Sequence, residues 1–554
     1  MKCQKNRSLL FFCKRMFCVV FFIAPWSLIW SQNRPQKPKL VVGIVVDQMR
    51  YDYLAVFSEK YSEGGFKKLI SKGFSCDSNY LNYVPTHTAP GHAGIYTGAL
   101  PAQHGIISNY WYDTSIHKAV YCVSDDSVEP VGTGSKADRS SPKRLLVPTL
   151  GDANREQTNM EGKTISISIK NRAAVLSGGK NANAAYWFRG KDQGHWITSS
   201  YYMKSLPQWV KDFNDSERLD GYMNLWEPLY PLETYTESRP DNSLFERGFS
   251  KKDKPVFPYD IKKLASRNGG YDVIKSTPYG NSYTLDFAAA ALQGEQLGSG
   301  DATDFLLISL SSTDYIGHNF GVNSKEVEDT YIRLDRDLAM FLEALDEQVG
   351  KDNYVLFLTS DHGATENPQH LKEQGRGGGY FKEATFIIEL KDYLSKVYGS
   401  SKIIEHIALN QVYLNKEVLA MLELSTSEVE KTIQQYILKQ PQISTAVTRT
   451  QLLQQEFSEG LEVLIQNGFH PDRSGDIAYL LEPSVVVYSK TGSDHGSGYD
   501  HDTHVPLLFY GAGIVSGSSK RLTSSVDIVS TLAAILGIQP PAAASGKTIH
   551  EALE

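Results

Sequence analysis

Side chains that can bind metal ions stand beside several short apolar runs in this sequence. They comprise three carboxylates, three histidines and one hydroxyl: Asp47, Asp314, Asp361, His318, His362, His504 and Thr88. Aspartate and histidine are ligands of zinc and similar ions. Each residue alone is weak evidence, because an aspartate after a strand is often a helix cap. Together, four strand ends favour two ions about 4 Å apart, which form a clamp for in-line phosphoryl displacement.

A repeated tetrapeptide complicates the choice of ligands. Residues 493–496 copy the Ser-Asp-His-Gly of residues 360–363, and only the earlier copy directly follows a strongly apolar run. We therefore predict Asp361 and His362 as ligands. His495 and His501 compete with His504 for one further position. The sequence favours His504, because it directly precedes the apolar run of a late predicted strand, 504–511.

A candidate nucleophile lies in the segment 83–92, a sharp turn that leads into a predicted helix. Pro90 suits the first turn of a helix, where its missing N–H costs nothing. A helix N-terminus offers unpaired N–H groups and favours a phosphate or another oxyanion. Thr88 is thus a candidate nucleophile beside an anion site. The same threonine also fits a plain N-cap, and this segment alone is compatible with both interpretations.

Two basic residues and an amide are candidates for binding a phosphoryl group. The alternation in 164–172 is typical of a strand, which would point Lys170 and Arg172 to the same face. Both could then contact the non-bridging oxygens of one phosphoryl group, and Asn109 could add a hydrogen bond. The alternatives are a solvated strand end for the two basic residues and a turn for Asn109.

The elements that must position these residues follow an α/β pattern. Continuous apolar runs at 39–47, 304–310 and 354–360 are typical of buried parallel strands, and ligands bind at the carboxyl edge of such sheets. Helical spacing follows at 53–73 and 327–345. We predict a mostly parallel central sheet flanked by helices, formed by residues 32–185, 265–385 and 475–554. An aromatic-rich insertion (186–264) and a helical insertion (386–474) would cap the site.

The N-terminal segment 1–31 is predicted to be a secretory signal peptide, with an uncleaved anchor as the alternative. It contains five basic and no acidic residues, so its removal would change the formal net charge from −7 to −12. Such an acidic chain argues against nucleic-acid binding. We expect an exported, periplasmic or secreted monomer with no stable membrane span.

Three of the five cysteines lie in that segment, which leaves Cys76 and Cys122. Two cysteines in an exported chain suggest one disulfide, here on segments that bracket the Thr88 turn. The alternative is two unpaired buried thiols.

The motifs, taken in order, resemble the alkaline phosphatase superfamily, in particular its PafA-type enzymes with a threonine nucleophile. The resemblance covers nearly the whole chain after the predicted signal peptide. Its most specific parts are the segments 45–50, 85–92, 111–113, 170–172, 359–363 and 503–506. It implies an alkaline-phosphatase-like fold and a secreted, zinc-dependent enzyme that hydrolyses phosphate monoesters through a phosphothreonine intermediate.

The resemblance also implies a role for each site residue. Thr88 would be the nucleophile, and Asn109, Lys170 and Arg172 would bind the phosphoryl oxygens. One Zn²⁺ would be held by Asp47, Thr88, Asp361 and His362, and a second by Asp314, His318 and His504.

Three other functions compete with that of a phosphomonoesterase. A sulfatase of the superfamily needs a cysteine or serine in a Cys/Ser-x-Pro-x-Arg setting, and Thr88 with Ala89-Pro90-Gly91-His92 does not match it. A nucleotide pyrophosphatase or phosphodiesterase shares the threonine and the zinc ligands, and only the pair Lys170 and Arg172 favours monoesters. The third alternative is a non-catalytic protein that binds metal or phosphate.

Overall fold

A ten-stranded sheet forms the centre of the computed structural model, which describes residues 37–191, 193–487 and 490–554. The predicted signal peptide, 1–31, lies outside the described residues. In strand order, the sheet consists of β20 (Gly517–Thr523), β2 (Phe74–Asn79), β19 (Leu507–Gly511), β12 (Tyr354–Thr359), β1 (Leu40–Val46), β11 (Asp304–Leu310), β6 (Thr164–Ser168), β7 (Ala184–Arg189), β8 (His195–Ser199) and β5 (Pro130–Val131).

The five central strands, from β12 to β7, run parallel to one another. Strand β19 runs antiparallel to β12, and β2 antiparallel to β19. A mostly parallel sheet of this kind confirms the predicted fold class.

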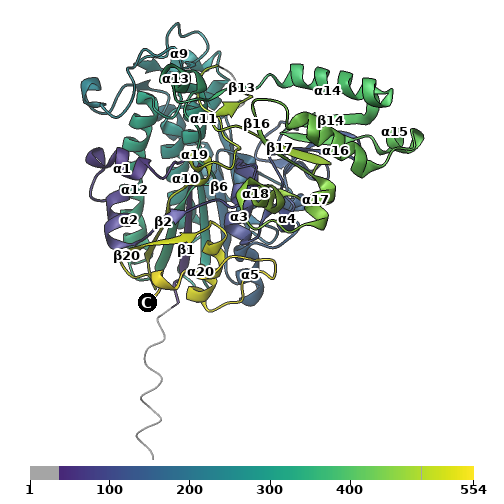
Figure 1. The fold of residues 1–554 in the computed structure, drawn as a ribbon. Helices are drawn as coiled ribbons and strands as arrows, with labels where there is room; N and C mark the ends of the chain where they lie inside the picture. The colour runs from purple at the N-terminus through teal and green to yellow at the C-terminus, as the bar shows by residue number, and fades with distance from the viewer. Residues whose placement is uncertain (1–36, 192, 488–489) are drawn as a thin grey trace, which may run out of the picture. The chain divides into compact units, whose positions relative to one another are not determined.

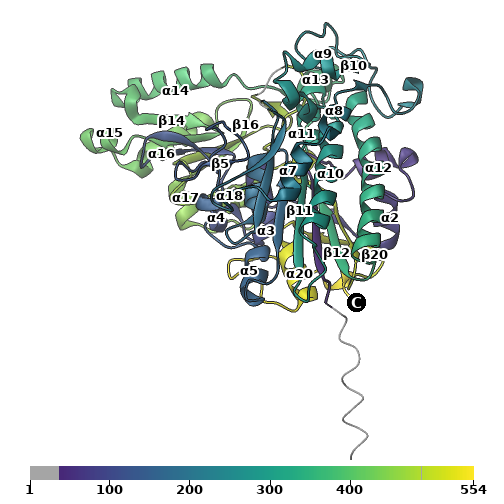
Figure 2. The same ribbon diagram turned by 180° about the vertical axis from the view of Figure 1, so that it is seen from behind.

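Helices cover both faces of the sheet, as the alternation of side chains along β1 requires. Leu40, Val42 and Ile44 pack in one hydrophobic cluster with residues of α10 (Tyr279–Gly294) and α12 (Lys325–Gln348). Val41 and Val45 pack on the other face with residues of α3 (Thr88–Thr97) and α20 (Asp527–Leu536). Figures 1 and 2 show these two helical layers from opposite sides.

The carboxyl ends of the central strands lie at a common edge. Val46 of β1 pairs with Leu310 of β11, Val45 pairs with Thr359 of β12, and Ser309 pairs with Ser168 of β6. The residues that follow these strands in sequence therefore meet at one place. Four predicted site segments begin there: 47–50, 311–318, 360–363 and 170–172.

The helical insertion forms a second, smaller layer pair with its own hydrophobic core. A four-stranded sheet of β14 (Ile404–Ala408), β15 (Gln411–Leu414), β17 (Ile477–Leu481) and β16 (Ile443–Thr448) packs against helices that include α14 (Glu383–Tyr398) and α16 (Thr426–Ile437). This unit projects to one side of the main sheet in both views (Figures 1 and 2). It extends beyond the predicted range 386–474, since β17 belongs to it.

Three local predictions differ from the structure. Strand β7 and strand β8 belong to the main sheet, although 186–199 were assigned to the aromatic insertion. The helix expected over 53–73 is divided into α1 (Tyr53–Val56), η1 (Ser58–Lys60) and α2 (Phe66–Lys72). The strand expected over 164–172 ends at Ser168, and α6 (Asn171–Gly178) begins immediately after it.

The predicted disulfide is not formed in the structure. Cys76 and Cys122 are both free and fully buried. Cys76 packs with the side chains beneath β2, whereas Cys122 follows β4 (Lys118–Tyr121) and packs in a different hydrophobic cluster. Burial raises the pKa of both thiols to about 12.

Of the helices in the described ranges, none combines the length and the apolar character that a membrane span needs.

Candidate active site

Thr88 is the first residue of α3, and His87 occupies the N-cap position with extended backbone angles. The threonine is therefore not the N-cap, which was the alternative left open by the sequence. Its side chain is almost fully buried, and the Arg172 guanidinium donates a hydrogen bond to its Oγ1 at 3.3 Å. The backbone N–H of Ala89 donates to Oδ1 of Asn109 at 2.9 Å. The hydroxyl thus lies at a helix N-terminus beside a guanidinium.

A first group of metal-competent side chains comprises Asp47, Asp361 and His362, whose ligand atoms all lie within 4.8 Å of one another. Nε2 of His362 is 3.6 Å from Oδ1 of Asp47 and 3.6 Å from Oδ2 of Asp361. All three residues are fully buried, and these three atoms have no hydrogen-bond partner among the residues that the structure describes. Buried polar atoms without partners are costly, so their convergence fits a bound cation.

This group lies next to the threonine. Helix α3 approaches the end of β12 so closely that a Cβ at Gly91 would lie 2.6 Å from Cβ of Asp361. Nδ1 of His92 is 2.8 Å from the carbonyl oxygen of Thr88 and 3.3 Å from Oδ2 of Asp361. His92 thereby connects the backbone of the candidate nucleophile to a candidate ligand.

A second group comprises Asp314, His318 and His495. Asp314 and His318 are one turn apart on α11 (Ser312–Phe320), which places them on one helix face. Oδ1 of Asp314 is 3.2 Å from Nε2 of His318 and 3.6 Å from Nε2 of His495. The two groups are adjacent, because the rings of His362 and His495 stack with 3.6 Å between their centroids.

All three candidate histidine ligands are held in the same orientation. Each donates from Nδ1 to a backbone carbonyl: His318 to Ser493 at 2.9 Å, His362 to Gly363 at 3.0 Å and His495 to Thr86 at 2.8 Å. A proton on Nδ1 leaves Nε2 of each ring as the nitrogen available to a metal ion. This arrangement is the usual outer support of a metal-binding histidine.

His504 was predicted as a ligand, and the structure places it elsewhere. Strand β19 does bring the start of the late strand to the correct edge of the sheet. However, the His504 ring stacks between Tyr51 and Tyr80, with centroid distances of 4.2 and 4.4 Å. Its Nε2 donates to the carbonyl of Asp77 at 3.0 Å. His495, from the second copy of the tetrapeptide, lies with Asp314 and His318 instead.

Lys170 joins the two groups. Its ammonium donates to Oδ2 of Asp47 at 2.7 Å and to Oδ2 of Asp314 at 2.6 Å, and it is almost fully buried. Burial alone would lower the pKa of Lys170, but these two carboxylates raise it above its ordinary value. Burial would raise the pKa of Asp314, but the charges of Lys170 and His318 hold it well below its usual range.

Asp47 behaves differently from Asp314. Burial and the charge of Asp361 raise the pKa of Asp47 to about 6, despite the nearby ammonium of Lys170. Close carboxylates disfavour joint ionisation, so added positive charge would stabilise the fully ionised set.

Lys170 and Arg172 reach the site for a reason other than the one predicted. They do not alternate along a strand. Lys170 is the N-cap of α6, and Arg172 lies in the first turn of that helix. The guanidinium of Arg172 is directed to Thr88, and its buried Nε has no hydrogen-bond partner in the described part of the chain.

Sequence reasoning missed three polar residues of the site. His495 was considered and set aside, although its tetrapeptide duplicates the one that was chosen. Gln48 donates from its side chain to Asp314 at 2.7 Å and from its backbone to Asp361 at 3.3 Å. Gln48 and His92 are each close in sequence to a predicted site residue, and that adjacency was the available signal.

Comparisons with known proteins agree with this geometry. The family model described as type I phosphodiesterase / nucleotide pyrophosphatase matches residues 41–505. "Alkaline phosphatase PafA" of Elizabethkingia meningoseptica is 42% identical over 94% of this chain and 95% of its own length. A protein named "Calcium-transporting ATPase" from Myroides odoratus is 44% identical over 95% and 96%. The crystal structure of wild-type alkaline phosphatase PafA matches with a TM-score of 0.90 at 41% identity, covering 94% of this chain and all of that one.

Proposed function

Since the chain belongs to the type I phosphodiesterase / nucleotide pyrophosphatase family and, within it, to the PafA-type alkaline phosphatases, we propose that it is a zinc-dependent phosphomonoesterase with Thr88 as its nucleophile. The observation that carries this proposal is the convergence of buried, unpartnered ligand atoms beside a threonine hydroxyl at a helix N-terminus. Substrates would be small phosphate monoesters.

The residues present fit two metal ions. Asp47, Asp361 and His362, with the hydroxyl of Thr88, would hold one, and Asp314, His318 and His495 would hold the other. Mixed imidazole and carboxylate donors suit zinc. When bound, such a pair lowers the pKa of an attacking hydroxyl and stabilises charge on a leaving oxygen.

The side chains of the protein position the phosphoryl group. Arg172, already within hydrogen-bond distance of Thr88, would bind two non-bridging oxygens through its planar fork. The Oδ1 of Asn109 is held by Ala89, so its amide N–H groups are the donors for a further oxygen. Lys170 would add a positive charge between the two metal groups.

The reaction divides into two displacements. Oγ1 of Thr88 gives up its proton and forms a bond to phosphorus as the bond from phosphorus to the alcohol oxygen breaks. The leaving alcohol oxygen takes up a proton in turn, so the first displacement releases no net proton. Water then attacks the phosphothreonine, which releases inorganic phosphate and restores the hydroxyl. Covalent catalysis of this kind replaces one difficult step by two easier ones.

The test of the nucleophile is Thr88→Ala, assayed with p-nitrophenyl phosphate. We expect a loss of about 1000-fold or more in kcat/KM, since the covalent route is removed. The Tm should stay close to that of the wild type. Near-normal turnover by this variant would exclude Thr88 as the nucleophile.

Diester hydrolysis is the alternative function, because the matching family includes phosphodiesterases by name. A monoester dianion carries more charge than a diester, so Lys170 and Arg172 should favour monoesters. We expect Lys170→Ala with Arg172→Ala to lower p-nitrophenyl phosphate turnover far more than bis-p-nitrophenyl phosphate turnover. Dominant diester hydrolysis by the wild type would favour the alternative. An absence of any turnover with zinc bound would indicate a non-catalytic protein.

Export and a monomeric state remain parts of the proposal. N-terminal sequencing of the mature protein from the producing cell tests cleavage near residue 31. Sedimentation of the purified protein tests the monomer.

A further inference from the structure

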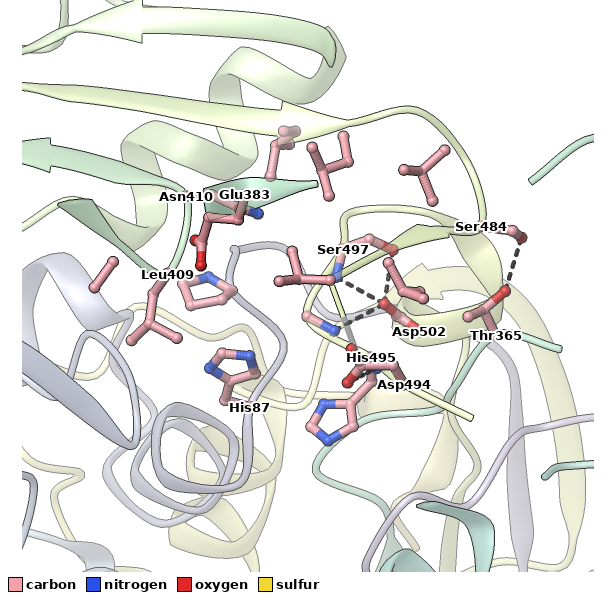
Figure 3. A pocket seen from close by; sticks show the side chains of 18 of the residues that line it. His87, Thr365, Glu383, Leu409, Asn410, Ser484, Asp494, His495, Ser497 and Asp502 are labelled. Carbon is pink, nitrogen blue, oxygen red and sulfur yellow. Dashed lines mark hydrogen bonds between the residues drawn. The ribbon is translucent and has the colours of Figure 1, made fainter. Parts of the chain in front are cut away.

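A cavity of about 480 Å³ adjoins the second metal-competent group and extends toward the inserted four-stranded sheet. Its walls include His87 and His495 on the core side and the β14–β15 turn at Leu409 and Asn410 on the insertion side. Figure 3 shows these side chains facing a common space, with Glu383 above the histidines. A volume of this size suits a small organic group.

In-line displacement decides which part of a substrate would occupy this cavity. The attacking and leaving oxygens lie on opposite sides of phosphorus. Thr88 adjoins the group of Asp47, Asp361 and His362, so the leaving oxygen would face the group that contains His495. His495 also lines the cavity. The organic part of the leaving alcohol would therefore enter it.

The cavity wall carries acidic side chains. Three carboxylates line it, those of Glu383, Asp494 and Asp502, whereas its described lining includes no lysine or arginine. Oδ2 of Asp502 accepts hydrogen bonds from the backbone N–H groups of Gly496 and Ser497 and from the Ser497 hydroxyl. Asp494 accepts from the backbone N–H of His495.

Glu383 differs from the other two carboxylates. It is the first residue of α14, half-buried, and no hydrogen bond or ion pair engages its side chain within the described ranges. Apolar side chains such as Ile407, Leu480 and Val486 surround the same space. A carboxylate in such partly desolvated surroundings interacts with a ligand charge more strongly than one in open water.

Resting on the proposed phosphomonoesterase function, we propose that this cavity is the leaving-group subsite and that Glu383 makes it selective for alcohols carrying an ammonium group. Neutral alcohols would be accepted, and leaving groups with a second anionic group would be disfavoured. The substrate class is thus phosphorylated amino alcohols and similar cationic monoesters.

The test uses three aryl phosphates of similar leaving-group reactivity: 4-(aminomethyl)phenyl, 4-methylphenyl and 4-(carboxymethyl)phenyl phosphate. For the wild type, we expect kcat/KM to fall in that order, with about threefold to tenfold between neighbours. Glu383→Gln should reduce the ratio of the aminomethyl to the methyl substrate toward one, and Glu383→Lys should invert it. The matched control is Glu389→Gln, an exposed glutamate on the same helix that is outside the cavity lining, and it should leave the ratios unchanged.

The outcomes separate the two proposals. Equal kcat/KM for the three substrates, or ratios in Glu383→Gln that match those of the wild type, would overturn the subsite while leaving the phosphatase intact. Failure of the wild type to hydrolyse even 4-methylphenyl phosphate would overturn the proposed function, and the subsite with it.

Discussion

The chain uses the same tetrapeptide, Ser-Asp-His-Gly, in two places, and the two copies behave differently. In the first copy, directly after β12, both Asp361 and His362 belong to one metal-competent group. In the second copy, in the loop that precedes α19 (Asp500–Thr503), only His495 does, and Asp494 faces the cavity. Local sequence selects a residue type, but the element that carries it decides which atom reaches the site.

The two copies differ because different backbone elements carry them. The parallel strand β12 fixes the direction of the first copy, and the Ser360 hydroxyl accepts from the backbone N–H of Met49 at 2.9 Å. The second copy follows no strand directly and is held by loop contacts: the backbone N–H of Ser493 donates to the carbonyl of Gly317, and Nδ1 of His495 donates to the carbonyl of Thr86. The two histidine rings then stack, so one copy of the motif supports the other.

Among variants that test the difference between the two copies, Asp361→Asn should have the largest effect. The change removes a buried ligand charge, and loss of one ion forfeits several kcal/mol of transition-state stabilisation, or about 1000-fold in rate. Elemental analysis should show about one metal ion fewer per chain. Full metal content with a near-normal rate would show that Asp361 is not a ligand.

His495→Ala should come next, with a loss of about 100-fold in kcat/KM and weaker retention of one metal ion during dialysis. The matched control is His504→Ala. His504 stacks between two tyrosines and bonds to Asp77, so this variant should lose about 1–2 kcal/mol of stability but keep both metal ions. The reverse result, with metal lost only from His504→Ala, would restore the assignment made from sequence.

Asp494→Asn should have the smallest effect, within about fivefold in kcat/KM for a neutral substrate, because it changes no ligand atom. Measuring steady-state kinetics for Asp494→Asn and Asp361→Asn in parallel would compare the two copies of the motif directly. Equal losses in the two variants would mean that the copies are functionally equivalent.

Much of the fold and most of the site could be predicted from the sequence. The continuous apolar runs of β1, β11 and β12 are enough to predict buried strands. Neighbouring parallel strands bring their carboxyl ends to the same edge of the sheet, whatever segments connect them. Asp47, Asp314 and Asp361 therefore followed from strand ends alone. Asn109, Lys170 and Arg172 also lie at the site, although their proposed roles await the experiments described above.

What could not be predicted depends on long-range packing. The choice between His495 and His504 depends on where a loop folds back over residues 86 and 362, which no local pattern encodes. The strand predicted over 164–172 is four residues longer than β6, because alternation alone does not show where a helix begins. The aromatic residues of β7 and β8 are typical of a cap, so the sequence pattern assigns 186–199 to an insertion, whereas both strands belong to the main sheet.

The ammonium of Lys170, which contacts both Asp47 and Asp314, also affects the stability of the site in the metal-free protein. Three buried carboxylates at one point would repel one another in a freshly folded chain, and an internal counter-ion reduces that repulsion. The metal-free protein can therefore keep its site preorganised and bind metal without refolding.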